Sequence, residues 1–293
     1  MAWSTRGEIN NVRELAERMD AITYGGVFGP VLFRGQANAE WGLQPSLLRT
    51  PVANEDVWKI EQFEQEGVML YRKSAHEFLD ASVLPSWRPE TKENELDVLV
   101  AWGLMQHYGG PTRVLDWTRS PYIATYFAVR ELPDDDALVW FYDSIALRRR
   151  WEQLGLTLRP LFWGDFREGG IRHNDLPIII DFAASEQTPR MVVQQCQLSV
   201  CTDVKLDHET AMENLQDGGS PAWFGKFVIP KESKYGIFKH LVAMGINAYA
   251  LFPGLDGLGR SLQELYQLKA DDLDQLRSQQ AVSHEVRGGE NSE

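Results

Sequence analysis

Apolar residues recur at three- and four-residue spacing near the start of the chain, which predicts a short amphipathic helix over residues 9–20. A longer helix is predicted over residues 54–78, with Asn54 as its N-cap and Gly67 as a point of interruption. Residues 94–108 are apolar on nearly every side and end at a Gly-Gly-Pro sequence. We therefore expect them to form a buried helix that stops there.

The pattern then changes to short apolar segments. A first strand is predicted at residues 31–34, and a compact helix at residues 120–129. Further β-rich or strand-like segments are residues 113–118, 137–142, 176–182, 190–200, 225–230 and 247–253, and closing helices are predicted at residues 231–246 and 254–269. Several strands with little helix between them favour an α+β fold with a mixed or antiparallel sheet over a doubly wound parallel one.

No internal repeat and no linker divides the sequence. We expect a single α+β domain over residues 1–275, with a helical insert at about residues 54–108. Residues 276–293 are polar and lack periodicity, so they are predicted to be a flexible tail.

The composition, with 43% hydrophobic and 24% charged residues, is that of a water-soluble protein, and no apolar run has the length of a membrane span. The first residues lack the features of a secretory signal, and the two cysteines, Cys196 and Cys201, fit a reducing compartment. We expect a cytoplasmic protein without membrane contact. The formal charge of −13 argues against a broad DNA-coating surface, and the run Arg148–Arg150 is interpreted as a solvated helix face.

Two charged residues interrupt apolar segments. Arg34 ends the strand "VLFRGQ", where it either pairs with Asp116 or Glu40 or binds an anion. Asp116, within "RVLDWT", is costly to bury alone, so it meets an arginine, caps the next helix or faces a site. A metal site built from His107, Asp116 and Asp143 is an alternative, but these residues lack a compact ligand motif and we expect no metal.

Three segments together resemble the FRG domain family, which is named for its Phe-Arg-Gly motif. They are "FRGQANAEWGLQPSLLR", "QHYGGPTRVLDWTRSPYIATYFA" and "RMVVQQCQLSV" before "LFPGLDGL". The resemblance extends over roughly residues 30–260. It implies the domain type but little about mechanism.

The order of these parts is also similar to that of the arginine-first ADP-ribosyltransferases. Those enzymes have a strand ending in Arg-Gly, then a Ser/Thr-bearing strand leading into a helix with an "A..FA" pattern, then a Glu or Gln on a later strand. This resemblance implies an ADP-ribosyltransferase-like fold and NAD as the substrate. The third position is filled by Gln194 or Gln195, with Glu186 as a nearby carboxylate that substitutes for it.

The residue types fit this chemistry. Arg34 can bind the pyrophosphate bidentately, and Gly35 lets the nicotinamide amide approach the backbone. Thr118 is expected to orient Arg34 or a ribose hydroxyl, while His107 and Tyr108 close the pocket. The residues assigned to the cofactor are Arg34, Gly35, Gln36, His107, Tyr108, Asp116 and Thr118, and those assigned to catalysis are Arg34, Thr118, Gln194 and Glu186.

The leading hypothesis is an NAD-dependent ADP-ribosyltransferase-like enzyme or NAD glycohydrolase, with a nucleic acid or protein as acceptor. A role as a toxin or anti-phage defence effector, restrained by a regulatory partner protein, follows from the habits of similar domains. The alternative is a non-catalytic module in which the same arginines bind phosphate of a nucleic acid or nucleotide.

Overall fold

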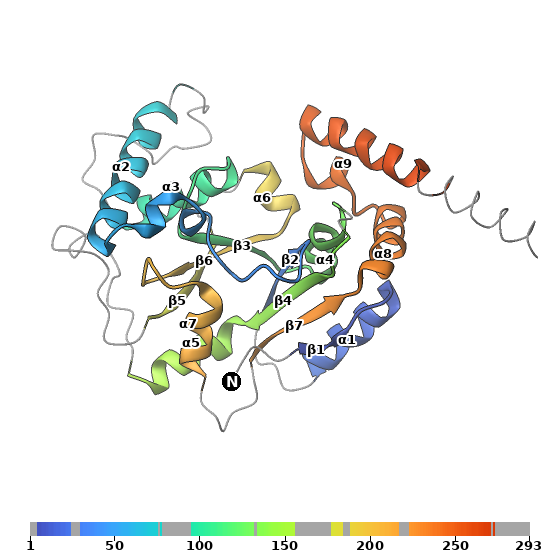
Figure 1. The fold of residues 1–293 in the computed structure, drawn as a ribbon, viewed down its shortest axis with the longest axis horizontal. Coiled ribbons are helices and arrows are strands. Elements are labelled where there is room, and N and C mark those ends of the chain that lie inside the picture. Colours follow the sequence, from blue (N-terminus) through green and yellow to red (C-terminus); the bar gives the residue numbers. More distant parts are fainter. Residues whose placement is uncertain are drawn as a thin grey trace, which may run out of the picture.

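A seven-stranded sheet with strand order β1-β7-β4-β2-β3-β6-β5 forms the centre of the computed structural model (Figure 1). Its described residues are 5–24, 30–75, 77, 95–131, 134–155, 177–183, 188–216, 223–270 and 272. The strands are β1 (Thr5–Glu8), β2 (Val31–Gln36), β3 (Val114–Thr118), β4 (Ala137–Asp143), β5 (Ile179–Phe182), β6 (Cys196–Cys201) and β7 (Phe224–Ile229). The edge strand β1 is parallel to β7, and the other neighbours are antiparallel. The expected α+β fold with a mixed sheet is confirmed.

Helices cover both faces of this sheet. They are α1 (Val12–Tyr24), α2 (Val57–Ala75), α3 (Glu95–His107), α4 (Pro121–Val129), α5 (Ser144–Gln153), α6 (Pro189–Val193), α7 (His208–Leu215), α8 (Lys231–Ala243) and α9 (Ala248–Leu251). Two short 3₁₀ helices, η1 (Leu47–Arg49) and η2 (Pro51–Asn54), precede α2, and residues 255–270 form a further helix.

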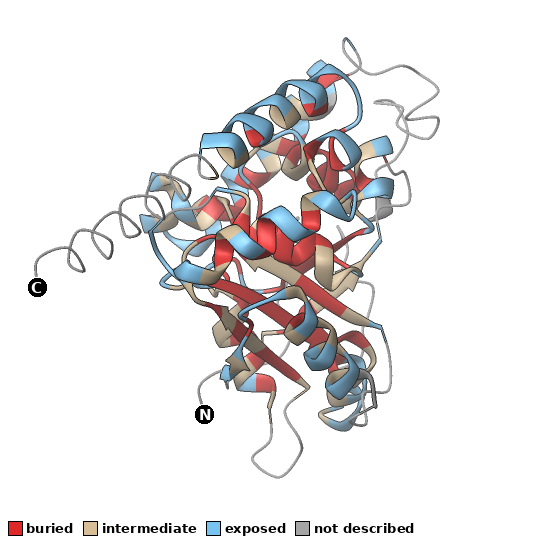
Figure 2. Ribbon diagram, turned by 90° about the vertical axis from the view of Figure 1, so that its right-hand side faces the viewer, coloured by how far each residue is buried: buried red, intermediate tan, exposed pale blue. Residues whose placement is uncertain are grey.

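Strand β4, which lies between β7 and β2, is buried along its whole length. Figure 2 shows buried residues running through the middle of the sheet. Val139 and Phe141 point into a core shared with α4 and α8, whereas Trp140 and Tyr142 point into a second core shared with α5 and α7. A strand covered on both faces needs apolar residues at every position, which explains its uninterrupted hydrophobic run.

Helix α3 lies against β3 and β6 in a third core. Trp102 and Met105 pack there with Met191 of α6 and Leu198 of β6. The buried helix expected from its all-round apolar surface is confirmed. The guanidinium of Arg113, just before β3, is fully buried and ion-paired with Glu64 of α2, so this pair holds the helical segment to the sheet.

Three sequence expectations are corrected. Residues 247–253 were expected to be strand-like but contain α9, because the Asn247 side chain accepts from the Ala250 backbone N–H and caps a helical turn. Residues 190–200 were expected to be wholly β-rich but begin with α6, which the Thr188 side chain and Pro189 initiate. Helix α2 begins at Val57, so Asn54 lies in η2 and is not its cap.

The boundaries differ elsewhere. Strand β1 was not expected, and α1 begins at Val12 rather than at residue 9. Helix α2 continues through Gly67, since one interior glycine costs only about 1 kcal/mol. The expected tail, residues 276–293, lies outside the described residues, and the domain limits stay a prediction. Among the described helices, none is both long and apolar enough to cross a membrane.

Candidate functional site

A cavity of about 530 Å³ lies where β2 and β3 separate. The two strands pair directly at Phe33 and Thr118, and beyond that point β2 continues along β4 alone. The lining side chains and backbone come from distant parts of the chain: residues 33–37, 40–42, 44, 49, 106–107, 116–118, 124, 127, 130–131, 190, 194, 196, 252 and 260. Its volume lies within the range of about 300 to 1,000 Å³ that is usual for small-molecule sites.

Arg34 enters this cavity from β2. Its Nη1 donates to the backbone carbonyl of Asp116 at 2.7 Å, and its buried Nε has no hydrogen-bond partner among the described residues. Neither Asp116 nor Glu40, the two carboxylates that the sequence offered, forms an ion pair with it within the described ranges. Burial lowers the pKa of Arg34, the nearby Asp116 charge partly opposes this shift, and Arg49 adds to it. The guanidinium therefore retains donors for an anion.

The Asp116 carboxylate lines the same cavity and is held by a neutral group. Its Oδ2 accepts from Gln106 Nε2 at 2.7 Å, and Gln106 Oε1 in turn accepts from the Thr112 hydroxyl at 2.7 Å and the Ser46 hydroxyl at 3.2 Å. These contacts fix the Gln106 amide so that its nitrogen faces Asp116. The site thus contains an oriented carboxylate whose hydrogen-bond partner carries no charge.

A hydrogen bond links Thr118 at the end of β3 to Gln194 at the end of α6, and both residues line the cavity. The Thr118 hydroxyl donates to the Gln194 backbone carbonyl at 2.8 Å, so it orients the turn before β6 rather than Arg34. Gln194 is the C-cap of α6 and does not lie on a strand, contrary to expectation. Its Nε2 donates to the Leu251 carbonyl at 2.9 Å, which leaves its Oε1 as an acceptor. Gln195 is exposed and does not line the cavity, and Glu186 lies outside the described residues.

His107 lines the cavity, but its neighbour Tyr108 does not. His107 Nε2 lies 3.1 Å from the Thr188 hydroxyl, and burial lowers the pKa of His107, with Arg190 lowering it further. The imidazole is accordingly neutral near pH 7. Tyr108 is 59% exposed and contacts the His107 ring edge-on, so its expected role in closing the pocket is not seen.

Gly35 and Gln36 have structural reasons for their identity. A Cβ at Gly35 would lie 1.8 Å from the Ala124 carbonyl oxygen, so glycine is what lets α4 pack directly on β2. The Gln36 amide is buried, accepts from the Trp140 indole N–H and donates to the Gly42 carbonyl at 3.0 Å. Both residues line the cavity, but the side chain of Gln36 is already engaged.

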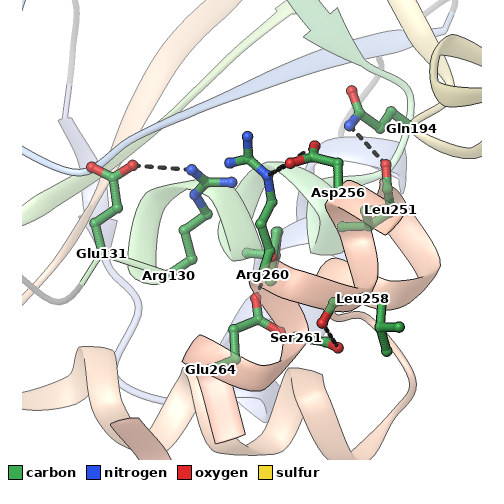
Figure 3. A network of polar contacts seen from close by, with 10 residues as sticks. Arg130, Glu131, Gln194, Leu251, Asp256, Leu258, Arg260, Ser261 and Glu264 are labelled. Carbon is green, nitrogen blue, oxygen red and sulfur yellow. Dashed lines mark hydrogen bonds and ion pairs between the residues drawn. The ribbon is translucent and has the colours of Figure 1, made fainter. Parts of the chain in front are cut away.

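Three further arginines were missed by the sequence reasoning. Arg130 follows α4, Arg190 lies on α6 and Arg260 lies on the helix of residues 255–270, and all three guanidinium groups surround the ring of Phe252. Figure 3 shows Arg130 and Arg260 extending in the same direction, with Asp256 between Arg260 and Gln194. Their sequence signal was weak because these three arginines and Phe252 are scattered between positions 130 and 260.

Two other lining residues come from the loop after β2. Arg49 is exposed at the end of η1, and Trp41 is 52% exposed. Both belong to the segment that carried the family resemblance, but no spacing rule assigned them to a site. They add a cation and an aromatic surface to the cavity.

Comparison with protein families gives one match. Residues 29–137 match the model of the FRG domain. No curated protein and no solved structure matched the chain. The resemblance over residues 30–260 is thus shown for its first part, and the ADP-ribosyltransferase likeness is not shown by these comparisons.

The FRG segment supplies one side of the cavity. It contains Arg34, Asp116 and Arg130, together with α3 and α4. Residues beyond the FRG segment supply the other side, including Arg190, Gln194 and the region around Phe252. A ligand in this cavity would therefore contact both the FRG segment and the part of the chain that follows it.

Proposed function

We propose that the cavity binds NAD and that the chain is an NAD-cleaving enzyme, either an ADP-ribosyltransferase or an NAD glycohydrolase. The observation that carries this proposal is the set of arginines lining one cavity of a chain with a net charge of −13: Arg34, Arg49, Arg130, Arg190 and Arg260. Arginine binds phosphate oxygens through paired N–H donors. A concentration of arginines in one cavity is typical of a site for a phosphorylated small molecule rather than of a broad nucleic-acid surface.

In this proposal, a charged residue binds the pyrophosphate of NAD and an aromatic residue binds one of its rings. Arg34 has an unpartnered buried Nε and holds the pyrophosphate, while the exposed indole of Trp41 offers a stacking surface for a flat ring. This arrangement would fix the dinucleotide at its centre and leave the nicotinamide ribose to the other cavity residues.

Cleavage breaks the bond between C1′ of the ribose and the nicotinamide nitrogen, and the electron pair leaves with nicotinamide. Positive charge then develops on the ribose, and the oriented Asp116 carboxylate is the group that would stabilise it. Gln194 Oε1 accepts from a ribose hydroxyl, which is the role expected for a glutamine at this place. Asp116 thus takes the part that the sequence hypothesis gave to Gln194 or Glu186.

The attacking group is water in a glycohydrolase and an acceptor nucleophile in a transferase. In either case it loses one proton as it bonds to C1′, and neutral His107 lies in the cavity as a proton acceptor. The products are nicotinamide and either ADP-ribose or an ADP-ribosylated protein or nucleic acid. A toxin or anti-phage defence role in the cytoplasm, restrained by a regulatory partner protein, is the setting that we propose for this activity.

The test measures NAD binding and cleavage with the full chain. NAD should raise the melting temperature, and mass analysis should detect released nicotinamide; both effects should disappear in Arg34→Ala. The control is Arg148→Ala, since Arg148 is exposed on α5 away from the cavity lining. An unchanged melting curve at millimolar NAD, with no nicotinamide released, would refute the proposal.

A non-catalytic phosphate-recognition module is the second candidate. It is favoured by the exposed positions of Trp41 and Arg49, which place an aromatic ring and a cation where single-stranded nucleic acid could reach them. Salt-dependent binding to an oligonucleotide without nicotinamide release would support this candidate over cleavage.

A further inference from the structure

Three cations converge on one aromatic ring in the cavity. The guanidinium carbons of Arg190, Arg260 and Arg130 lie 4.5, 4.7 and 5.5 Å from the centroid of the Phe252 ring. They come from α6, from the helix of residues 255–270 and from the end of α4. The tertiary fold therefore gathers like charges that repel one another.

Carboxylates compensate this charge only in part. Arg130 pairs with Glu131 at 3.2 Å and Arg260 with Asp256 at 2.9 Å, and both acidic side chains are more than half exposed. Exposed pairs of this kind contribute little stability. Arg190 has no ion pair among the described residues, and its buried Nε has no hydrogen-bond partner there.

Packing alone does not account for the cluster. Phe252 is already buried in the core that contains Leu251 and Phe238, so its ring does not need three cations to cover it. Burial lowers the pKa of Arg190, and the neighbouring Arg260 lowers it further, while Asp116 and Asp256 oppose this shift only in part, so holding the charged form there has a cost. An anion between the guanidinium groups would remove that cost.

We propose that Arg130, Arg190 and Arg260 form a second anion subsite, which takes a phosphate monoester separate from the pyrophosphate held by Arg34. The proposal rests on the proposed function for its ligand, a nucleotide. It makes the preferred ligand a dinucleotide with an additional phosphate on its adenosine ribose, as in NADP. Because the three guanidinium groups converge on one ring, the subsite suits a compact terminal phosphate better than a continuous nucleic-acid backbone.

The experiment compares NADP and NAD by calorimetry on the full chain. We expect NADP to bind at least about tenfold more tightly, which is the effect of one additional charge-assisted contact. Arg190→Ala should remove this preference, because it should weaken NADP binding at least about tenfold more than NAD binding. Arg34→Ala should weaken both ligands, and Arg148→Ala should weaken neither.

Two further variants and a measurement on the wild-type chain test the proposal without relying on Arg190→Ala alone. Arg260→Ala should also reduce the NADP preference, and Arg190→Lys should restore part of it because it restores the charge. Inorganic phosphate should raise the melting temperature of the wild-type chain and compete with NADP more strongly than with NAD. Circular dichroism checks that each variant is folded.

The outcomes separate this inference from the proposed function. NADP preference without nicotinamide release would uphold the subsite and refute cleavage. Nicotinamide release with equal affinities for NAD and NADP would uphold cleavage and refute the subsite. The proposal would also be overturned if Arg190→Ala weakened binding of an oligonucleotide and left binding of NADP unchanged. That result would assign the cluster to nucleic acid.

Discussion

The Arg34 guanidinium donates to the backbone carbonyl of Asp116, at 2.7 Å, while the Asp116 carboxylate accepts from Gln106. The two side chains line one cavity and form no direct ion pair, although the Asp116 charge acts to raise the pKa of Arg34. A hydrogen bond to a backbone carbonyl positions a guanidinium, and the uncharged carbonyl does not neutralise it. In the proposed function, this relationship leaves Arg34 to bind an anion and Asp116 to face a developing cation.

Arg34→Lys should weaken NAD binding by roughly 10- to 100-fold, although it retains the positive charge. A lysine ammonium cannot hold the Asp116 carbonyl and bind a phosphate bidentately at the same time. Calorimetry measures the effect. Arg49→Lys serves as the matched control, because Arg49 is exposed and should show a smaller loss. Equal losses in the two variants would contradict the role assigned to Arg34.

Asp116→Asn should lower the rate of nicotinamide release by roughly 100-fold or more and leave NAD affinity within a few-fold of the wild type. The isosteric amide keeps the shape of the side chain but removes the charge that faces the ribose cation. Gln194→Ala should lower the rate of nicotinamide release only about tenfold, which corresponds to the loss of one hydrogen bond. If Asp116→Asn leaves this rate unchanged, stabilisation of the ribose cation would be assigned to Gln194 or Glu186 instead.

Gly35→Ala should destabilise the fold by about 3 kcal/mol or more, because the added Cβ would overlap the Ala124 carbonyl, to which its distance would be 1.8 Å. Urea unfolding measures this change. Gly42→Ala is a nearby control, since its Cβ would lie 3.4 Å from the Glu209 carboxylate. A stable Gly35→Ala variant that merely binds NAD poorly would show that close ligand approach, rather than helix packing, requires the glycine.

Arg113→Met should destabilise the protein by about 3 to 5 kcal/mol, because it leaves the buried Glu64 carboxylate without its partner. The double variant Glu64→Leu/Arg113→Met should recover much of this loss, since no unpaired member of the pair remains. Denaturation of both single variants and the double variant gives the coupling energy. If the stability loss of the double variant equalled the sum of the losses of the two single variants, the pair would not be what docks α2 on the sheet.

Stability should fall as pH falls from 6.5 towards 3, in part through His208. Burial lowers the pKa of His208 to about 3, from an ordinary value of 6.5. Between these values the unfolded chain binds a proton that the folded chain does not, so acid favours unfolding. Above pH 6.5 the side chain is neutral in both states and this contribution is constant.

His208→Leu tests this contribution through urea unfolding at pH 4.5 and pH 7. The difference in unfolding free energy between the two pH values should be smaller in the variant than in the wild type. His240→Leu is the control, because His240 is exposed on α8 and meets solvent in both states. A pH dependence that His208→Leu leaves intact would assign the acid sensitivity to other groups.

The amino-acid sequence by itself determined the elements whose patterns are local. The apolar segment at residues 137–142, the all-round apolar surface of residues 94–108 and the compact helical pattern of residues 120–129 correspond to β4, α3 and α4. It also indicated Arg34, Gly35, Asp116 and Thr118, which the structure brings to one cavity. Local periodicity carries this information because burial on one or both faces dictates which residues an element can use.

Only the tertiary structure decided which side chains share a site and what each is free to do. Arg190 and Arg260 reach Phe252 because α6 contacts α9, and because the helix of residues 255–270 contacts α4 through Glu264 and Tyr126. No spacing within the sequence encodes that meeting. Likewise, the sequence could not show that Gln36 and Thr118 already use their polar groups on Trp140 and Gln194. These contacts join residues distant in the chain, so their partners are set by packing and not by local preference.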